Sequence, residues 1–99
     1  MTASKILESA LPSQIQAAMA LSLLRLKNAN RLDLEDIAHV MGVTSVQSVS
    51  NYISGTTKMT AICWLKVTAR WPELNEMMLA ELDEAEKAAS AKQRTLKLA

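Results

Sequence analysis

Short, neutral hydrogen-bonding side chains gather near the middle of the sequence. They are Thr44, Ser45, Gln47, Ser48, Ser50, Asn51 and Ser54, with Lys58 a few residues later. Such side chains both donate and accept hydrogen bonds, and the amides of Asn and Gln match the donor and acceptor on the edge of adenine. This run therefore favours recognition of base edges in the DNA major groove, with Lys58 meeting a phosphate. The alternative is a polar face that meets only solvent.

The residue sets on which enzymes and metal sites depend are missing from the sequence. It has one histidine, His39, and one cysteine, Cys63, so no second histidine or cysteine stands at metal-binding spacing from either. No Ser-His-Asp set, paired carboxylates or glycine-rich phosphate loop emerges. We therefore expect a protein that is not an enzyme, with no metal, other cofactor or small-molecule ligand. A lone cysteine forms no intrachain disulfide, which predicts a packed thiol in a cytoplasmic protein.

Two short helices are predicted to position the polar run. Asp33 has the residue type of an N-cap for the first helix, and Asp36 stands three residues later. Gly42 is expected to end that helix in a left-handed conformation. Either Thr44 or Ser45 can then cap the second helix, which carries most of the polar side chains.

The apolar residues of the two helices predict how they pack. Ala38 is small enough for the helices to cross closely, and Val43 is expected to fill the space beneath the turn. Val49 and Tyr52, three residues apart, are expected to anchor the second helix to the core. Two short helices that cross at such a turn form a helix-turn-helix unit.

The whole chain has the composition of a helical protein. Of its 99 residues 49% are hydrophobic, and it has two glycines, two prolines and no phenylalanine. Apolar spacings of three and four predict an all-α compact bundle of about five to six helices in a single domain, 1–99. The motif-bearing bundle is assigned to residues 13–71, a C-terminal oligomerising helix to 73–91 and a frayed tail to 92–99. The apolar-rich stretch Ile15 to Leu26 is too short and too polar to span a bilayer, so no membrane partner is expected.

Charge is unevenly distributed along the chain, although the formal net charge is only +1. Residues 21–70 hold six basic and three acidic side chains, whereas residues 71–99 hold four basic and six acidic ones. A basic middle and an acidic end fit one half that faces DNA and one that faces away. Lys27 and Arg31, just before the first helix of the motif, are further candidates for phosphate contacts.

The stretch from Leu23 to Trp71 resembles the Cro/repressor family of phage and bacterial regulators, also called the xenobiotic-response-element type. The matching segments are Leu26-Lys27, Leu32, Glu35-Asp36-Ile37-Ala38, Met41-Gly42-Val43, Val49-Ser50-Asn51-Tyr52, Gly55 and Trp64-Leu65-Lys66-Val67. The resemblance implies a bundle of about five helices that binds operator DNA as a dimer. In layout the chain is also similar to small phage CII-type activators, which carry an oligomerising C-terminal helix.

Two positions depart from the family pattern. One extra residue lies between Gly42 and Val49, so either the turn is longer or the recognition helix starts later. Leu34 stands where the family often has a phosphate-binding Gln, so that contact has to come from elsewhere or be absent.

The last predicted helix carries an apolar stripe. Its members are Leu74, Met77, Met78, Leu82, Ala85 and Ala89. A second copy of the helix is the expected partner for this stripe, which makes the protein a homodimer or higher homo-oligomer. The alternative is that the helix folds back on its own bundle.

Together these features predict a sequence-specific transcription regulator, a phage or mobile-element repressor or activator that binds double-stranded operator DNA. The near-neutral charge favours the alternative, a protein-binding helix-turn-helix module such as an antitoxin or antirepressor.

Overall fold

The computed structural model describes the backbone of residues 3–98 and the side chains of residues 5–88. Within this range the chain forms six helices and no strand. They are α1 (Ala3–Ser9), α2 (Pro12–Asn30), α3 (Leu34–Met41), α4 (Val46–Ser54), α5 (Ala61–Arg70) and α6 (Glu73–Leu98). The prediction of an all-α bundle of five to six helices is confirmed.

Local hydrogen bonds define where α2 and α3 begin. The Leu11 backbone N–H donates to Oε1 of Gln14 at 2.8 Å, just before Pro12 opens α2. Asp33 is the N-cap of α3, as predicted, and its backbone N–H donates to the Asp36 carboxylate at 3.1 Å. These bonds satisfy backbone donors that the first turn of a helix leaves without partners.

The last helix is longer than predicted. The sequence predicts an end near Ala91 and a frayed tail from Lys92, whereas α6 continues to Leu98. After Pro72 the sequence contains no glycine or proline, so no residue in that stretch favours helix termination. Residue 99 lies outside the described range.

The core lies between α2 and α6 and extends to the motif helices. Its largest fully buried apolar side chains are Leu23, Val49, Ile37, Val67 and Leu74. α2 and α6 make the most extensive helix–helix contact in the described chain.

The chain itself buries part of the α6 stripe. Leu74, Met78 and Leu82 are all buried against the rest of the bundle. For these three residues the alternative prediction, a helix folded back on its own bundle, is the correct one. Ala85 of the same stripe remains exposed.

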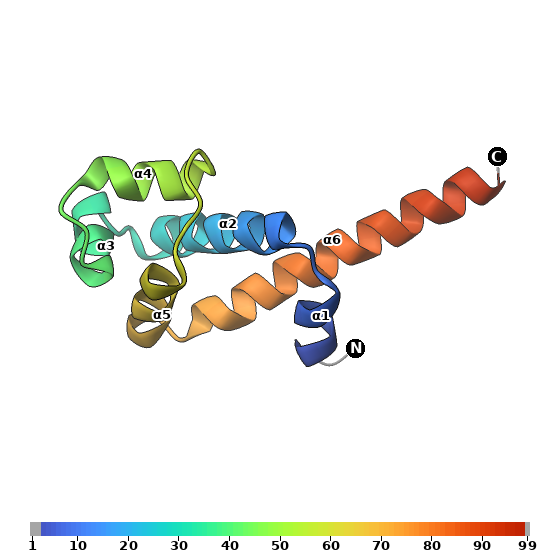
Figure 1. Ribbon diagram of the computed structural model, residues 1–99, viewed down its shortest axis with the longest axis horizontal. Coiled ribbons are helices and arrows are strands. Elements are labelled where there is room, and N and C mark those ends of the chain that lie inside the picture. Colours follow the sequence, from blue (N-terminus) through green and yellow to red (C-terminus); the bar gives the residue numbers. More distant parts are fainter. Residues whose placement is uncertain (1–2, 99) are drawn as a thin grey trace.

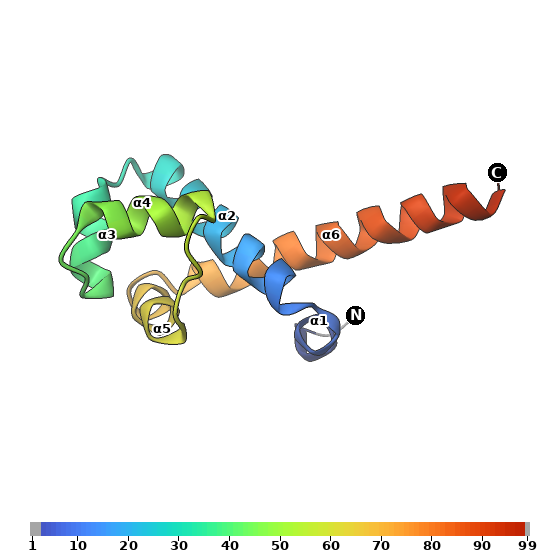
Figure 2. The same cartoon turned by 45° about the horizontal axis from the view of Figure 1, so that its top comes forward.

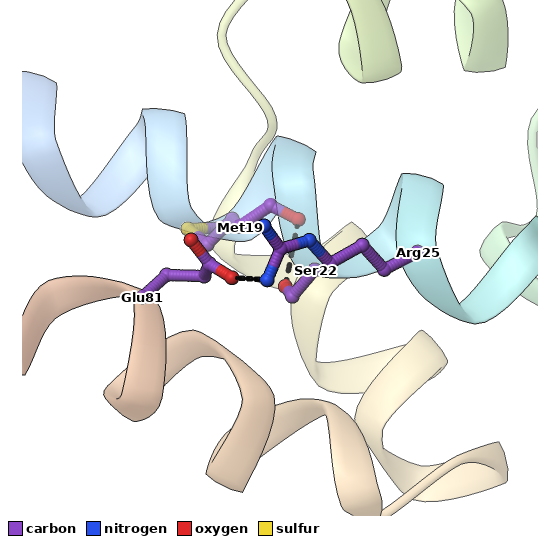
Figure 3. A network of polar contacts seen from close by, with 4 residues as sticks. All are labelled: Met19, Ser22, Arg25 and Glu81. Atoms are coloured by element: carbon purple, nitrogen blue, oxygen red, sulfur yellow. Dashed lines mark hydrogen bonds and ion pairs between the residues drawn. The ribbon is translucent and has the colours of Figure 1, made fainter. Parts of the chain in front are cut away.

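A polar contact links the two central helices on one side of the core. Arg25 on α2 forms an ion pair with Glu81 on α6, and the buried Ser22 hydroxyl donates to the Met19 carbonyl at 3.0 Å (Figure 3). The Ser22 bond satisfies a hydroxyl that would otherwise be buried without a partner.

The six helices form an elongated molecule of 51 × 25 × 23 Å. Figures 1 and 2 show α3 and α4 at one end, while α6 runs away from them and passes beyond α1 and α2. No helix in the described part of the chain combines the length and apolar character that crossing a membrane requires.

Candidate nucleic-acid interface

The turn between α3 and α4 is built around Gly42 and Ala38. Gly42 has φ +76°, the left-handed conformation that glycine adopts without a steric cost. Its N–H and that of Val43 both donate to the Ala38 carbonyl, at 3.0 and 3.1 Å. The Ala38 residue is only 6% exposed. A larger side chain at this position would have to displace the neighbouring helix.

α4 starts after a four-residue link, 42–45. Ser45 is its N-cap, and the Ser45 hydroxyl oxygen accepts from the Gln47 backbone N–H at 3.1 Å. Of the two capping candidates from the sequence, Ser45 is therefore the correct one. The helix proper begins at Val46.

One face of α4 belongs to the core. Val49 is fully buried, and Tyr52 and Ile53 are half-buried against the core cluster. This confirms the predicted inward face. Because helical residues three and four positions apart lie on the same side, the positions opposite Val49 are turned outward.

Gln47, Asn51 and Ser54 share the outward face at spacings of four and three. The Gln47 side-chain N–H donates to Oδ1 of Asn51 at 3.0 Å. The Ser54 hydroxyl donates to the Asn51 backbone carbonyl at 3.2 Å. The structure thus brings three predicted site residues into one hydrogen-bonded row, in which the Gln47–Asn51 bond holds the two amides together.

The other predicted site residues surround this row. Thr44 and Ser45 are exposed in the turn at the N-terminal end of α4, and Lys58 is exposed in the loop after its C-terminal end. Ser48 and Ser50 are half-buried on the flanks. Ser48 is turned from Gln47 by roughly 100° about the helix axis, since a turn takes 3.6 residues. It therefore lies further from the row than the sequence pattern suggested.

The loop that carries Lys58 is held to α2 by a residue that sequence reasoning did not select. Nε2 of Gln16 donates to the Met59 carbonyl, and the Met59 N–H donates to Oε1 of Gln16, both at 2.8 Å. Thr57 N–H donates to the Asn51 carbonyl at 3.2 Å, which closes the loop onto the end of α4. The available signal was that Gln16 interrupts the apolar stripe of α2.

A hollow lies between α2 and the same loop, beside the Gln16–Met59 bonds. It has a volume of about 230 Å³, and Gln16, Tyr52, Thr57 and Lys58 are among its lining residues. Its presence beside Lys58 leaves the ammonium group access to solvent on this side of α4.

A second cation reaches the helix-turn-helix from α5. Nζ of Lys66 lies over Gly42, so close that a Cβ at that position would stand 2.8 Å from it. This ammonium group faces the C-terminal end of α3, where the helix dipole favours a positive charge. From the sequence, Lys66 was only one of several basic residues, because Gly42, the residue it approaches, lies 24 positions earlier in the chain.

The single cysteine and the single histidine are not part of this set of polar and basic residues. Cys63 is a free thiol buried in the core, as the sequence predicts. His39 is exposed on α3. Among the described residues, no group of histidine, cysteine and carboxylate side chains has an arrangement that would hold a metal ion.

Comparison with protein-family models, with curated proteins and with solved structures found no match to this chain. The Cro/repressor resemblance thus rests on the residues quoted for it, and function has to be argued from the geometry of α3, α4 and their surroundings.

Proposed function

We propose that this protein is a sequence-specific DNA-binding transcription regulator, a phage or mobile-element repressor or activator that acts in the cytoplasm. The observation that carries this proposal is the row of Gln47, Asn51 and Ser54 on the outward face of α4. Neutral amides and hydroxyls suit base edges in the major groove, which is wide enough to admit an α-helix.

Each part of the interface has a role in this proposal. α4 lies in the major groove, and its amide row reads base edges. Lys58 at one end of α4 meets a backbone phosphate and fixes the register of the helix on the duplex. Lys66, beside the turn at the other end, adds positive charge near the DNA. Phosphate contacts raise affinity for any sequence, whereas the amide row discriminates between sequences.

A selection from random double-stranded DNA, followed by mobility shifts at low and moderate salt, tests the proposal. Wild-type protein is expected to enrich a defined sequence, and the double variant Gln47→Ala/Asn51→Ala to lose that preference. Asn75→Ala is the matched control, because Asn75 is an exposed amide on α6, away from the interface. If wild-type protein binds no DNA, or binds every sequence equally, the proposal is wrong.

A second candidate function is a protein-binding module, such as an antitoxin or antirepressor. Two large apolar side chains on α5 favour it, because Ile62 and Leu65 are 67% and 66% exposed. They lie three residues apart on one side of the helix, and exposed apolar patches mark protein-binding surfaces. If this candidate is the right one, Ile62→Ser/Leu65→Ser should abolish binding of the partner protein in a pull-down experiment. The same variant should leave DNA affinity unchanged.

A further inference from the structure

The C-terminal part of α6 extends beyond the bundle. Among the residues whose side chains the structure describes, Glu86 is the last on α6 to line the hollow that α6 forms with α1 and α2. In Figures 1 and 2 the remainder of the helix continues past α1 with no other helix of the described chain beside it. A helical segment of about a dozen residues is only marginally stable in water by itself, so packing on another surface would stabilise it.

The sequence of α6 divides at this point into an acidic and a basic segment. The acidic segment, 73–86, contains Glu73, Glu76, Glu81, Asp83, Glu84 and Glu86 and no basic residue. The basic segment, 87–98, contains Lys87, Lys92, Arg94 and Lys97 and no acidic residue.

This order suits an antiparallel neighbour of the same sequence. Two antiparallel copies of α6 that cross near Glu86 and Lys87 bring each acidic segment alongside the basic segment of the other copy. Two parallel copies would bring like charges together, which destabilises the pair. The dipole of α6 itself also favours acids at its start, but that effect fades within the first turn and does not account for Glu81, Asp83, Glu84 or Glu86.

Part of the local charge is already neutralised within one chain. Glu81 pairs with Arg25, and Lys87 pairs with Asp83 at 3.1 Å, a hydrogen bond that raises the pKa of Lys87. Arg25 contacts only Oε1 of Glu81, so the other carboxylate oxygen can accept from a cation of a second copy. Lys92 lies as far after the crossing as Glu81 lies before it, so the two face each other in the antiparallel pair.

An apolar hollow that such a neighbour can occupy lies between α2 and α6. This hollow of about 200 Å³ is lined by Gln14, Ala17, Ala18, Leu21, Glu81, Leu82 and Ala85. Its small alanine side chains leave room for another helix to approach closely. Ala85 and Ala89 continue the apolar spacing of α6 beyond Leu82. The apolar stripe that lines the hollow therefore extends into the basic segment.

We propose that a second copy of this chain packs antiparallel along α6. The basic segment of that copy lies in the hollow between α2 and the acidic segment. This inference goes beyond the proposed DNA binding and does not depend on it, because it concerns a different part of the chain and is tested without DNA.

Charge reversal tests the direction of packing. One variant carries Lys92→Glu, and the other carries Glu81→Lys. Each variant alone should dimerise at least about tenfold more weakly than wild type, because like charges then face each other. An equimolar mixture of the two should recover a heterodimer. The readouts are light scattering of each variant and native mass spectrometry of the mixture, with circular dichroism to check folding.

Three results would overturn the proposal. The first is a monomeric wild-type protein, and the second is a pair of folded variants that dimerise as strongly as wild type. The third is an equimolar mixture of the two variants that forms no heterodimer, although opposite charges then meet on both sides of the crossing.

Cysteine cross-linking gives a second, independent readout. Ala88→Cys lies near the proposed crossing and should form a disulfide with its copy, whereas Glu76→Cys should not, because its copy lies at the far end. Wild-type protein is the control, since its Cys63 is buried. Self-cross-linking at Glu76→Cys, or at neither position, would contradict the antiparallel arrangement.

Discussion

The side-chain amide of Gln47 donates a hydrogen bond to Oδ1 of Asn51, one turn later on α4, at 3.0 Å. This bond leaves the Asn51 amide N–H groups and the Gln47 carbonyl oxygen directed to other partners. Two amides linked in this way restrict each other's rotation. If α4 reads DNA, they should therefore act as one recognition unit.

The double-mutant cycle of Gln47→Ala and Asn51→Ala measures this coupling. Each single variant should lose about 1–3 kcal/mol of discrimination between the selected sequence and scrambled DNA. The double variant should lose less than the sum of the two, by roughly 0.5 kcal/mol or more. Fluorescence anisotropy with both DNAs gives the four affinities for each duplex. Strictly additive losses would show that the two amides act independently.

Lys58→Ala should weaken binding to all DNA sequences about equally. Its ammonium group is exposed in the loop after α4, where it is placed to meet a phosphate rather than a base. Losing one phosphate contact lowers the slope of log affinity against log salt by about one unit. Lys5→Ala, on α1 and away from α3 and α4, is the control and should leave the slope unchanged. An unaltered slope in Lys58→Ala would remove this residue from the interface.

Ala38→Leu should destabilise the whole bundle. The residue is 6% exposed beside the turn between α3 and α4, so the extra carbon atoms of leucine have no free space. Overpacking of this kind costs about 1–3 kcal/mol. In a domain of this size each kcal/mol lowers the melting temperature by about 4–8 °C. Ala80→Leu, on the exposed side of α6, should melt like wild type, and equal melting of both variants would argue against the close crossing of α3 and α4.

Gln16→Ala should release the loop that carries Lys58. The variant loses both hydrogen bonds to the Met59 backbone, a loss of about 1–3 kcal/mol in the free energy of unfolding. Hydrogen exchange at the Met59 amide should accelerate more than global unfolding requires. Gln14→Ala removes a single exposed bond and should have a much smaller effect. Unchanged protection of the Met59 amide would show that the loop is held by other contacts.

Arg31→Gly should stabilise the protein. Arg31 ends α2 with φ +52°, a left-handed conformation that costs a non-glycine residue roughly 1–2 kcal/mol. Glycine removes most of this strain, and the melting temperature should rise by several degrees. Arg31→Ala keeps the strain but loses the charge, so it should not gain stability. Equal gains in both variants would point to electrostatic repulsion at Arg31 instead of backbone strain.

Signals confined to a few neighbouring residues predicted the local structure around the candidate interface. Asp33 and Asp36 begin α3, Gly42 ends it and Ser45 caps α4, each through bonds that span four residues or fewer. The burial of Val49 followed from helical spacing alone. These features depend on the backbone of one segment, so the amino-acid types there were sufficient to anticipate them.

Tertiary packing decided the features that join distant segments. Gln16 meets Met59 across 43 positions, and Lys66 comes to lie over Gly42 only because α5 packs on α3. The α6 stripe shows the same limit, because Met78 is buried in the bundle whereas Ala85 is exposed. Helical spacing determines which residues share a face, but the position and length of neighbouring helices determine how much of that face is covered.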